Sequence, residues 1–189
     1  MRVSNGKAGS MVDRLSKYFG RLLEAWLIAL MVALTIIVVV AVIFRKLGNS
    51  LSWYDEVASI MLVWVTYYGS ALAALRRKHI GFDGFLLSLA DGPRKAAFIL
   101  SEVLIIAFFV LFTWGGWIVF QVVEGDGLVS LPWVPQQIPH SVIPIGGVVF
   151  ILAELLSIPA AWRAVSTGRS LEHADIEQEI RAVQAEKAR

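Results

Sequence analysis

Long apolar blocks alternate with short polar segments along the chain. Four of these blocks, residues 22–44, 53–75, 96–123 and 139–162, contain few charged side chains. A helix needs about 20 apolar residues, at a rise of about 1.5 Å each, to cross the hydrocarbon core of a membrane. Because backbone amides cannot remain unpaired in lipid, each block should be helical. The pattern predicts an all-α membrane protein with four transmembrane helices.

Composition supports the membrane location. Of the 189 residues, 57% are hydrophobic and 17% are charged, whereas about a quarter of the residues of soluble domains are charged. The first apolar block is longer than the about 7–15 residues of a signal-peptide core, so it is expected to be an uncleaved span. The absence of cysteine excludes disulfides, thiolate metal sites and iron–sulfur clusters.

Basic residues gather on one side of this four-span topology. Of the 17 Lys and Arg residues, all except Arg45 and Lys46 lie in the N-terminal segment, between spans two and three, or in the C-terminal tail. The positive-inside rule then places both termini in the cytoplasm, and we expect the spans to lie in an inner (plasma) membrane. The expected organisation is a cytoplasmic segment (1–21), a four-helix transmembrane domain (22–162) and a cytoplasmic helical tail (163–189).

The connecting segments carry patterns of their own. Apolar residues at i, i+3, i+4 and i+7 predict an amphipathic helix between spans two and three, lying in the inner interface or against a partner protein. They are Phe82, Phe85, Leu86 and Leu89. The outer loop 124–138 is stiffened by Pro132 and Pro135, and Pro139 suits the first turn of span four. In the tail, Ser170 is expected to cap a helix.

Enzyme motifs are missing from the sequence. It contains no glycine-rich phosphate loop, no G-x-S-x-G nucleophile elbow and no H-E-x-x-H zinc motif. Haem ligation is excluded because His79, His140 and His173 lie too far apart in the four-span topology for any two to share one iron. We therefore expect neither enzymatic activity nor a cofactor. Membrane orientation explains the basic residues, so no nucleic-acid partner is expected.

Two carboxylates lie inside the spans, where ionisable groups are costly and often functional. Glu102 in span three and Glu154 in span four reach a similar depth in the inner half, because the two spans run antiparallel. Neither span contains a Lys or Arg that could pair with them. Three interpretations remain open: contact with lipid headgroups, contact with another subunit, or a proton or sodium relay.

Span two offers a helix-contact face. Ser52 can cap its start, and acidic residues follow at the positive end of the helix dipole. Further along, Gly69 and Ala73, like Ser70 and Ala74, are small residues four apart. Such pairs allow helices to approach closely in lipid. This face should therefore contact another helix, either within the chain or in a partner.

Several short motifs occur in a characteristic order. They are Arg45 at the end of span one, Trp53 and Glu56 at the start of span two, Gly69 within it, His79, Ile80 and Asp83 after it, and Ile143-Pro144-Ile145-Gly146 in span four. This order and spacing resemble the small membrane subunit, the DctQ type, of tripartite ATP-independent periplasmic (TRAP) transporters. The resemblance covers residues 22–162. Gly81 departs from the family pattern, which has a β-branched or basic residue there.

The resemblance implies a scaffold role in sodium-coupled transport. The small subunit would brace a large, many-span subunit that binds substrate and sodium and moves by an elevator-type mechanism. A periplasmic binding protein would deliver the substrate, typically an organic acid. Candidate interface residues are Trp53, Glu56, Gly69, Ala73, His79, Asp83, Glu102 and Glu154, and candidates for docking the binding protein are Arg45, Lys46 and Trp133. A stand-alone carrier or channel is the alternative, although no internal repeat supports it.

Overall fold

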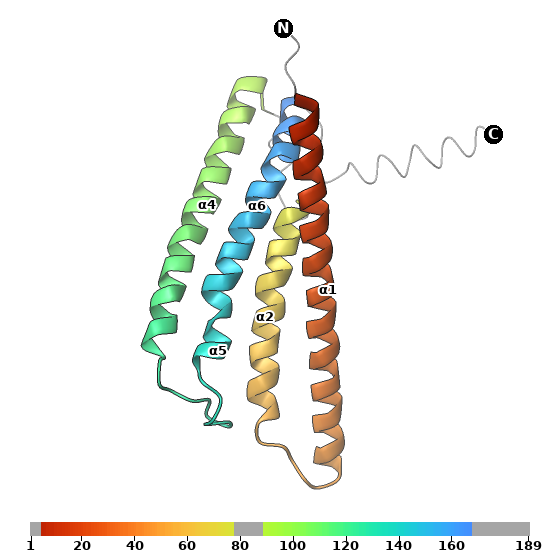
Figure 1. Cartoon of the computed structure of the whole chain (residues 1–189), viewed down its shortest axis with the longest axis vertical. Helices are drawn as coiled ribbons and strands as arrows, with labels where there is room; N and C mark the ends of the chain where they lie inside the picture. The colour runs from red at the N-terminus through yellow and green to blue at the C-terminus, as the bar shows by residue number, and fades with distance from the viewer. Residues whose placement is uncertain (1–4, 78–88, 168–189) are drawn as a thin grey trace, which may run out of the picture.

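Long helices dominate the structure. The computed structural model describes residues 5–77 and 89–167. Figure 1 shows α1 (Asn5–Lys46), α2 (Tyr54–Leu75), α4 (Asp91–Val122) and α6 (Val142–Thr167), with the single-turn helix α5 (Gln137–His140) before α6. Each of these four helices has the length and the hydropathy needed to cross a membrane, which confirms the predicted all-α fold with four spans.

Some helix boundaries differ from those predicted. Helix α1 begins at Asn5, so much of the N-terminal segment extends the first span as one continuous helix. A helix can continue through polar residues where it leaves the membrane, and this segment contains no proline that would break it. Pro139 lies in α5, a separate turn directly before α6, and the fourth candidate span begins with this turn at Gln137. The amphipathic helix expected around residues 82–89 and the tail helix expected from Ser170 lie outside the described residues, apart from Leu89, which is in a bend.

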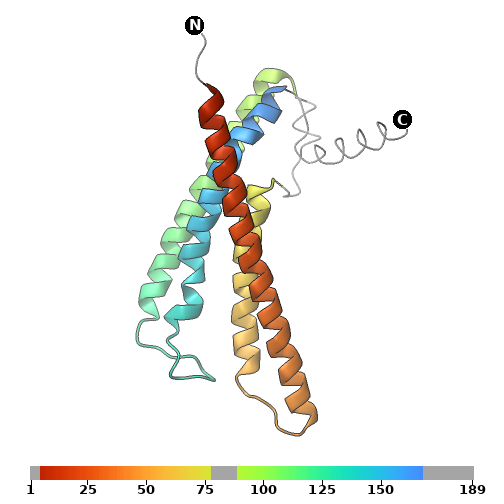
Figure 2. The same ribbon diagram turned by 45° about the vertical axis from the view of Figure 1, so that its right-hand side comes forward.

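The long helices lie side by side in the order α4, α6, α2, α1 (Figures 1 and 2). Helix α6 packs between α4 and α2, and 44% of its most apolar stretch is buried, against 11% for each other span. Broad apolar sides of α1 and α4 therefore remain exposed. We call the end with the connections 47–53 and 123–136 the loop end. The opposite end, where α1 begins and α6 ends, is the termini end (Figure 1).

Close packing around α6 depends on three glycines. A Cβ atom on Gly147 would lie 2.2 Å from Thr113 Oγ1 in α4, and one on Gly146 would lie 2.9 Å from Tyr67 Cδ1 in α2. In α4, a Cβ atom on Gly116 would lie 2.4 Å from Ile143 Cγ2. A larger residue at any of these points would have to displace the neighbouring side chain or helix. The glycines therefore allow α6 to fit between its two neighbours.

The core lies where α1, α2 and α6 meet. Leu23 of α1 packs there with Ala71 and Ala74 of α2 and with Phe150 of α6. The Phe109 ring of α4 stacks on Phe150, with 3.6 Å between the ring centroids. The small residues of α2 thus make helix contacts within the chain, one of the two possibilities that their spacing left open.

Candidate functional site

A buried cluster of charged residues joins three helices near the termini end. Arg77 follows the last turn of α2, and its Nη1 lies 2.5 Å from Glu102 Oε1 in α4 and 3.1 Å from Glu154 Oε1 in α6. Its Nε donates a hydrogen bond of 2.9 Å to Ser157 Oγ, also in α6. We call Arg77, Glu102, Glu154 and Ser157 the ionic cluster. One arginine side chain therefore ties the end of α2 to both of the helices that follow.

The backbone of Arg77 adopts a conformation usually left to glycine. Its φ angle is 51°, in the left-handed region, and its amide donates to the Ala74 carbonyl oxygen at 3.1 Å. Helices often end with glycine in this conformation, because a Cβ atom makes it less favourable by about 1–2 kcal/mol. Arginine occupies the position here, and its side chain makes the ion pairs with Glu102 and Glu154.

The ionic cluster is shielded from its surroundings. The side chains of Glu102 and Glu154 are 8% and 4% exposed, and that of Arg77 is 18% exposed. The Arg77 guanidinium lies 5.7 Å from the centre of the Phe98 ring, within the range of a cation–π contact. Two polar atoms in the cluster, Arg77 Nη2 and Glu102 Oε2, are buried without a hydrogen-bond partner. Arg77 Nη2 can therefore donate a further hydrogen bond, and Glu102 Oε2 can accept one.

Sequence reasoning missed Arg77 because it searched for a basic partner inside spans three and four. The partner comes instead from the end of α2, which Figure 1 shows stopping short of the termini end of the other long helices. Arg77 therefore lies at the depth of the two glutamates. A signal was present, since Arg76 and Arg77 directly follow the last apolar residues of a span antiparallel to span three. The prediction that Glu102 and Glu154 lie at a subunit interface is not tested by these contacts.

At the loop end, Glu56 anchors the connection between α4 and α5. Its carboxylate accepts hydrogen bonds from the amides of Val129 at 3.0 Å and Ser130 at 2.8 Å, and also from the Ser130 hydroxyl. These amides are more than seventy residues away in the sequence. The side chain therefore fixes the loop to the start of α2.

The loop also stabilises itself. The Leu128 amide donates to the Val134 carbonyl oxygen at 3.0 Å, and the Gln136 amide donates to the Asp126 carbonyl oxygen at 2.9 Å. Gly127 leaves no room for a side chain, since a Cβ atom there would lie 2.3 Å from the Pro132 carbonyl oxygen. These contacts hold 123–136 in a defined shape that leaves Trp133 79% exposed.

Other predicted site residues are spread over the molecule. Arg45 and Lys46 are exposed at the end of α1, and Trp53 and Ala73 are partly buried in or beside α2. Gly69 faces α1, where a Cβ atom would lie 4.0 Å from Leu27 Cδ2. His79 and Asp83 lie outside the described residues. The predicted Ser52 cap is wrong, because α2 begins at Tyr54 with Trp53 at its N-cap and no side chain caps it.

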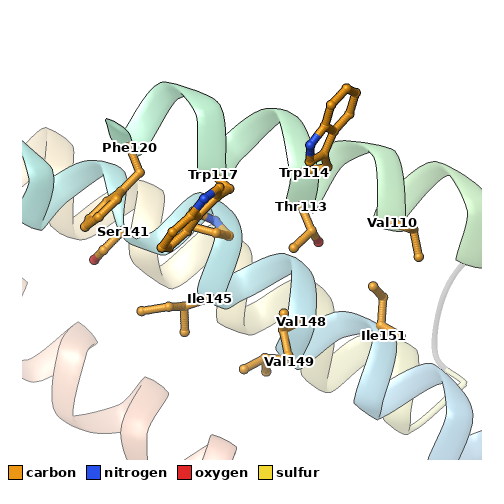
Figure 3. Close-up of a pocket in the computed structure, with 11 residues that line it drawn as sticks. Val110, Thr113, Trp114, Trp117, Phe120, Ser141, Ile145, Val148, Val149 and Ile151 are labelled. Carbon is orange, nitrogen blue, oxygen red and sulfur yellow. The ribbon is translucent and has the colours of Figure 1, made fainter. Parts of the chain in front are cut away.

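An apolar groove of about 600 Å³ runs between α4 and α6 toward the loop end. Trp117, Phe120, Ile145 and Val148 are among its lining residues. In Figure 3, Trp117 points toward α6, whereas Trp114 projects away from it. A groove of this kind can accept an acyl chain or the side chains of a neighbouring helix, because both are apolar.

Together, the four apolar helices and their packing define a multi-pass membrane protein. The family model described as "Tripartite ATP-independent periplasmic transporters, DctQ component" matches residues 34–164, which is more than half of the chain. The chain therefore belongs to the DctQ family, the small membrane component of TRAP transporters. No curated protein matches the chain. The resemblance seen in the motifs is confirmed, and it identifies a transporter component rather than an enzyme family.

Proposed function

We propose that this chain braces the large transport subunit of a TRAP system during sodium-coupled uptake of an organic acid, which a periplasmic binding protein delivers. The observation that carries this proposal is the packing of α6 between α2 and α4, with the ionic cluster joining all three. A scaffold must keep its shape while its partner moves. Tightly packed helices joined by a buried arginine suit that role better than they suit a moving element.

The exposed apolar sides support a partner in the membrane. Leu104 and Leu111 of α4 are 61% and 64% exposed, and Ile28 and Ile36 of α1 are 58% and 57% exposed. Lipid can cover such surfaces, and so can the helices of a large subunit. We propose that the interface also includes Trp53 at the start of α2 and the partly buried Ala73 within it, together with His79 and Asp83, whereas Gly69 would support the interface from its contact with α1.

Glu102 and Glu154 belong to the same proposal in a different way. Because their side chains are buried against Arg77, they would support the interface by holding α2, α4 and α6 in position. Glu102→Leu and Glu154→Leu should each weaken association with the large subunit, measured by co-purification. Undiminished recovery of the partner with both variants would contradict this role.

We propose that the loop end faces the periplasm and receives the binding protein through Arg45, Lys46 and Trp133. The distribution of basic residues supports this orientation. Because the chain has no cysteine, a single introduced cysteine is a clean probe. In intact spheroplasts, a membrane-impermeant maleimide should label Val129→Cys and spare Met11→Cys, at positions that are 92% and 73% exposed. The reverse pattern would invert the topology.

The transport role is tested by reconstitution. The large subunit of the same system is placed in vesicles with and without this chain, and uptake is driven by a sodium gradient in the presence of the binding protein. The bracing role predicts uptake only when both membrane subunits are present. Full uptake without this chain would contradict it. Uptake by this chain alone would support the less favoured reading of a stand-alone carrier.

A further inference from the structure

The charges of the ionic cluster do not balance. One guanidinium faces two buried carboxyl groups, so full ionisation would leave a net negative charge enclosed by three apolar helices. Removing an uncompensated charge from water is costly, and buried acids avoid this cost by taking up a proton. The cluster is therefore electrically neutral only if it contains one further positive charge besides that of Arg77.

The hydrogen-bonding pattern of the two carboxyl groups also indicates a bound proton. Glu102 is more than nine-tenths buried, and its Oε2 atom has no hydrogen-bond donor. Glu102 Oε1 and Glu154 Oε1 lie 2.5 Å and 3.1 Å from the same nitrogen, Arg77 Nη1, so the two carboxyl groups are neighbours and a hydrogen bond between them needs a donor. Two ionised carboxylates cannot form such a bond, because each is only an acceptor. A proton on either carboxyl group supplies the donor.

We propose that Glu102 and Glu154 together bind one proton at neutral pH. The cluster then contains one guanidinium, one carboxylate and one shared carboxylic acid proton, and it is electrically neutral. Loss of the proton leaves two carboxylates to repel each other across the contact between α4 and α6. The glutamate pair is thus a proton-sensitive contact between α4 and α6. This inference does not rest on the proposed role in transport.

A proton fits this position better than a metal ion. Among the described residues, no group of three or more His, Asp or Glu side chains lies together as a metal would require. Ser157 adds one hydroxyl, which accepts from Arg77 Nε and donates to the Glu154 carbonyl oxygen at 2.7 Å. A metal ion between the two carboxyl groups would lie next to the Arg77 guanidinium and would be repelled by its positive charge.

Several other charged groups near the termini end are paired with one another, namely Arg76 with Glu24, Arg163 with Asp13, and Arg94 and Lys95 with Asp91. Arg14, Lys17 and Arg21 are exposed on α1. Within the part of the chain that the structure describes, Arg77 is the cation within 4 Å of Glu102 or Glu154. No second described base is therefore in contact to balance the second carboxylate.

Infrared spectroscopy of the full chain in lipid vesicles tests the proposal. A protonated carboxylic acid has a carbonyl stretching band that a carboxylate lacks, and this band shifts in heavy water. Wild-type protein at pH 7 should show a band equivalent to about one protonated carboxyl group per chain.

Variants show whether the pair shares the proton. Glu102→Gln and Glu154→Gln each leave one carboxylate for one arginine, so both should lose the band at pH 7. Glu24→Gln is the matched control, because Glu24 pairs with Arg76 at 2.7 Å but is 46% exposed, and its loss should leave the band unchanged. Absence of the band from the wild type would overturn the proposal whether or not the variants fold. A band that persists in either single variant would overturn sharing by the pair.

Discussion

The two ends of the molecule hold the same helices together by different means. Near the termini end, Arg77 joins α2 to α4 and α6 through two buried carboxyl groups. Toward the loop end, Gly116, Gly146 and Gly147 let the helices touch directly, while Glu56 only secures a loop. Charge in a buried site is sensitive to the loss of a partner, whereas close packing is sensitive to added volume. Removal of a charged group should therefore destabilise the packing near the termini end, and added side-chain volume should destabilise the packing toward the loop end.

Arg77→Leu should have the largest effect. It leaves two buried carboxyl groups without their cation, which costs roughly 3–5 kcal/mol of folding stability. The deficit should shrink as pH falls, because protonation removes the uncompensated charge. The chain has seven tryptophans, so thermal unfolding in mild detergent can be followed by intrinsic fluorescence.

Arg76→Leu is the matched control for this experiment. Arg76 is the neighbouring arginine, and its ion pair with Glu24 at 2.7 Å is about half exposed, so its loss should cost at most about 1 kcal/mol. Equal destabilisation by the two substitutions would show that the ionic cluster has no special importance for the fold.

Gly116→Ala should have the next largest effect and should act on the other end. The added methyl group would clash with Ile143 Cγ2 at 2.4 Å, and overpacking of this kind costs about 1–3 kcal/mol. Gly115→Ala is the control, since no atom lies within 4 Å of its Cβ position. It should leave the melting temperature unchanged or raise it, because alanine favours a helix over glycine by about 1 kcal/mol. Similar melting temperatures for the two variants would contradict close packing at this position.

Glu56→Gln should have the smallest effect on the whole fold and a local effect on the loop. The amide keeps one oxygen acceptor but loses the charge that attracts the Val129 and Ser130 amides. Chymotrypsin should then cut at the exposed Trp133 faster than in the wild type, at an almost unchanged melting temperature. Asp55→Asn, at the exposed neighbouring position, should not speed cleavage. Equal cleavage rates in Glu56→Gln and the wild type would show that the loop keeps its shape without Glu56.

The spans were predictable from sequence because membrane crossing depends on local composition. Each helix needs an apolar stretch of a certain length, and four such stretches are visible in the chain. The similar depth of Glu102 and Glu154 also followed from helix length and direction alone. Order within the membrane, with α6 between α2 and α4, depends on contacts between distant residues such as Gly147 and Thr113, which no local pattern encodes.

Two site contacts escaped prediction for related reasons. Arg77 was counted among the basic residues that set orientation, because its position after an apolar span is typical of a loop charge. Its left-handed backbone conformation and its partners emerge only from the packed fold. Glu56 was expected to favour a helix start, and its bonds to a loop more than seventy residues away have no sequence signature.

The central claim is that this chain is a bracing subunit of a larger transporter. The most direct test is to purify the tagged chain from its native membrane in mild detergent and to identify bound proteins by mass spectrometry. The account predicts a many-span membrane protein in stoichiometric amount with the wild type and with Arg76→Leu, and much less of it with Arg77→Leu. Recovery of the wild-type chain alone, in several detergents, would contradict the claim.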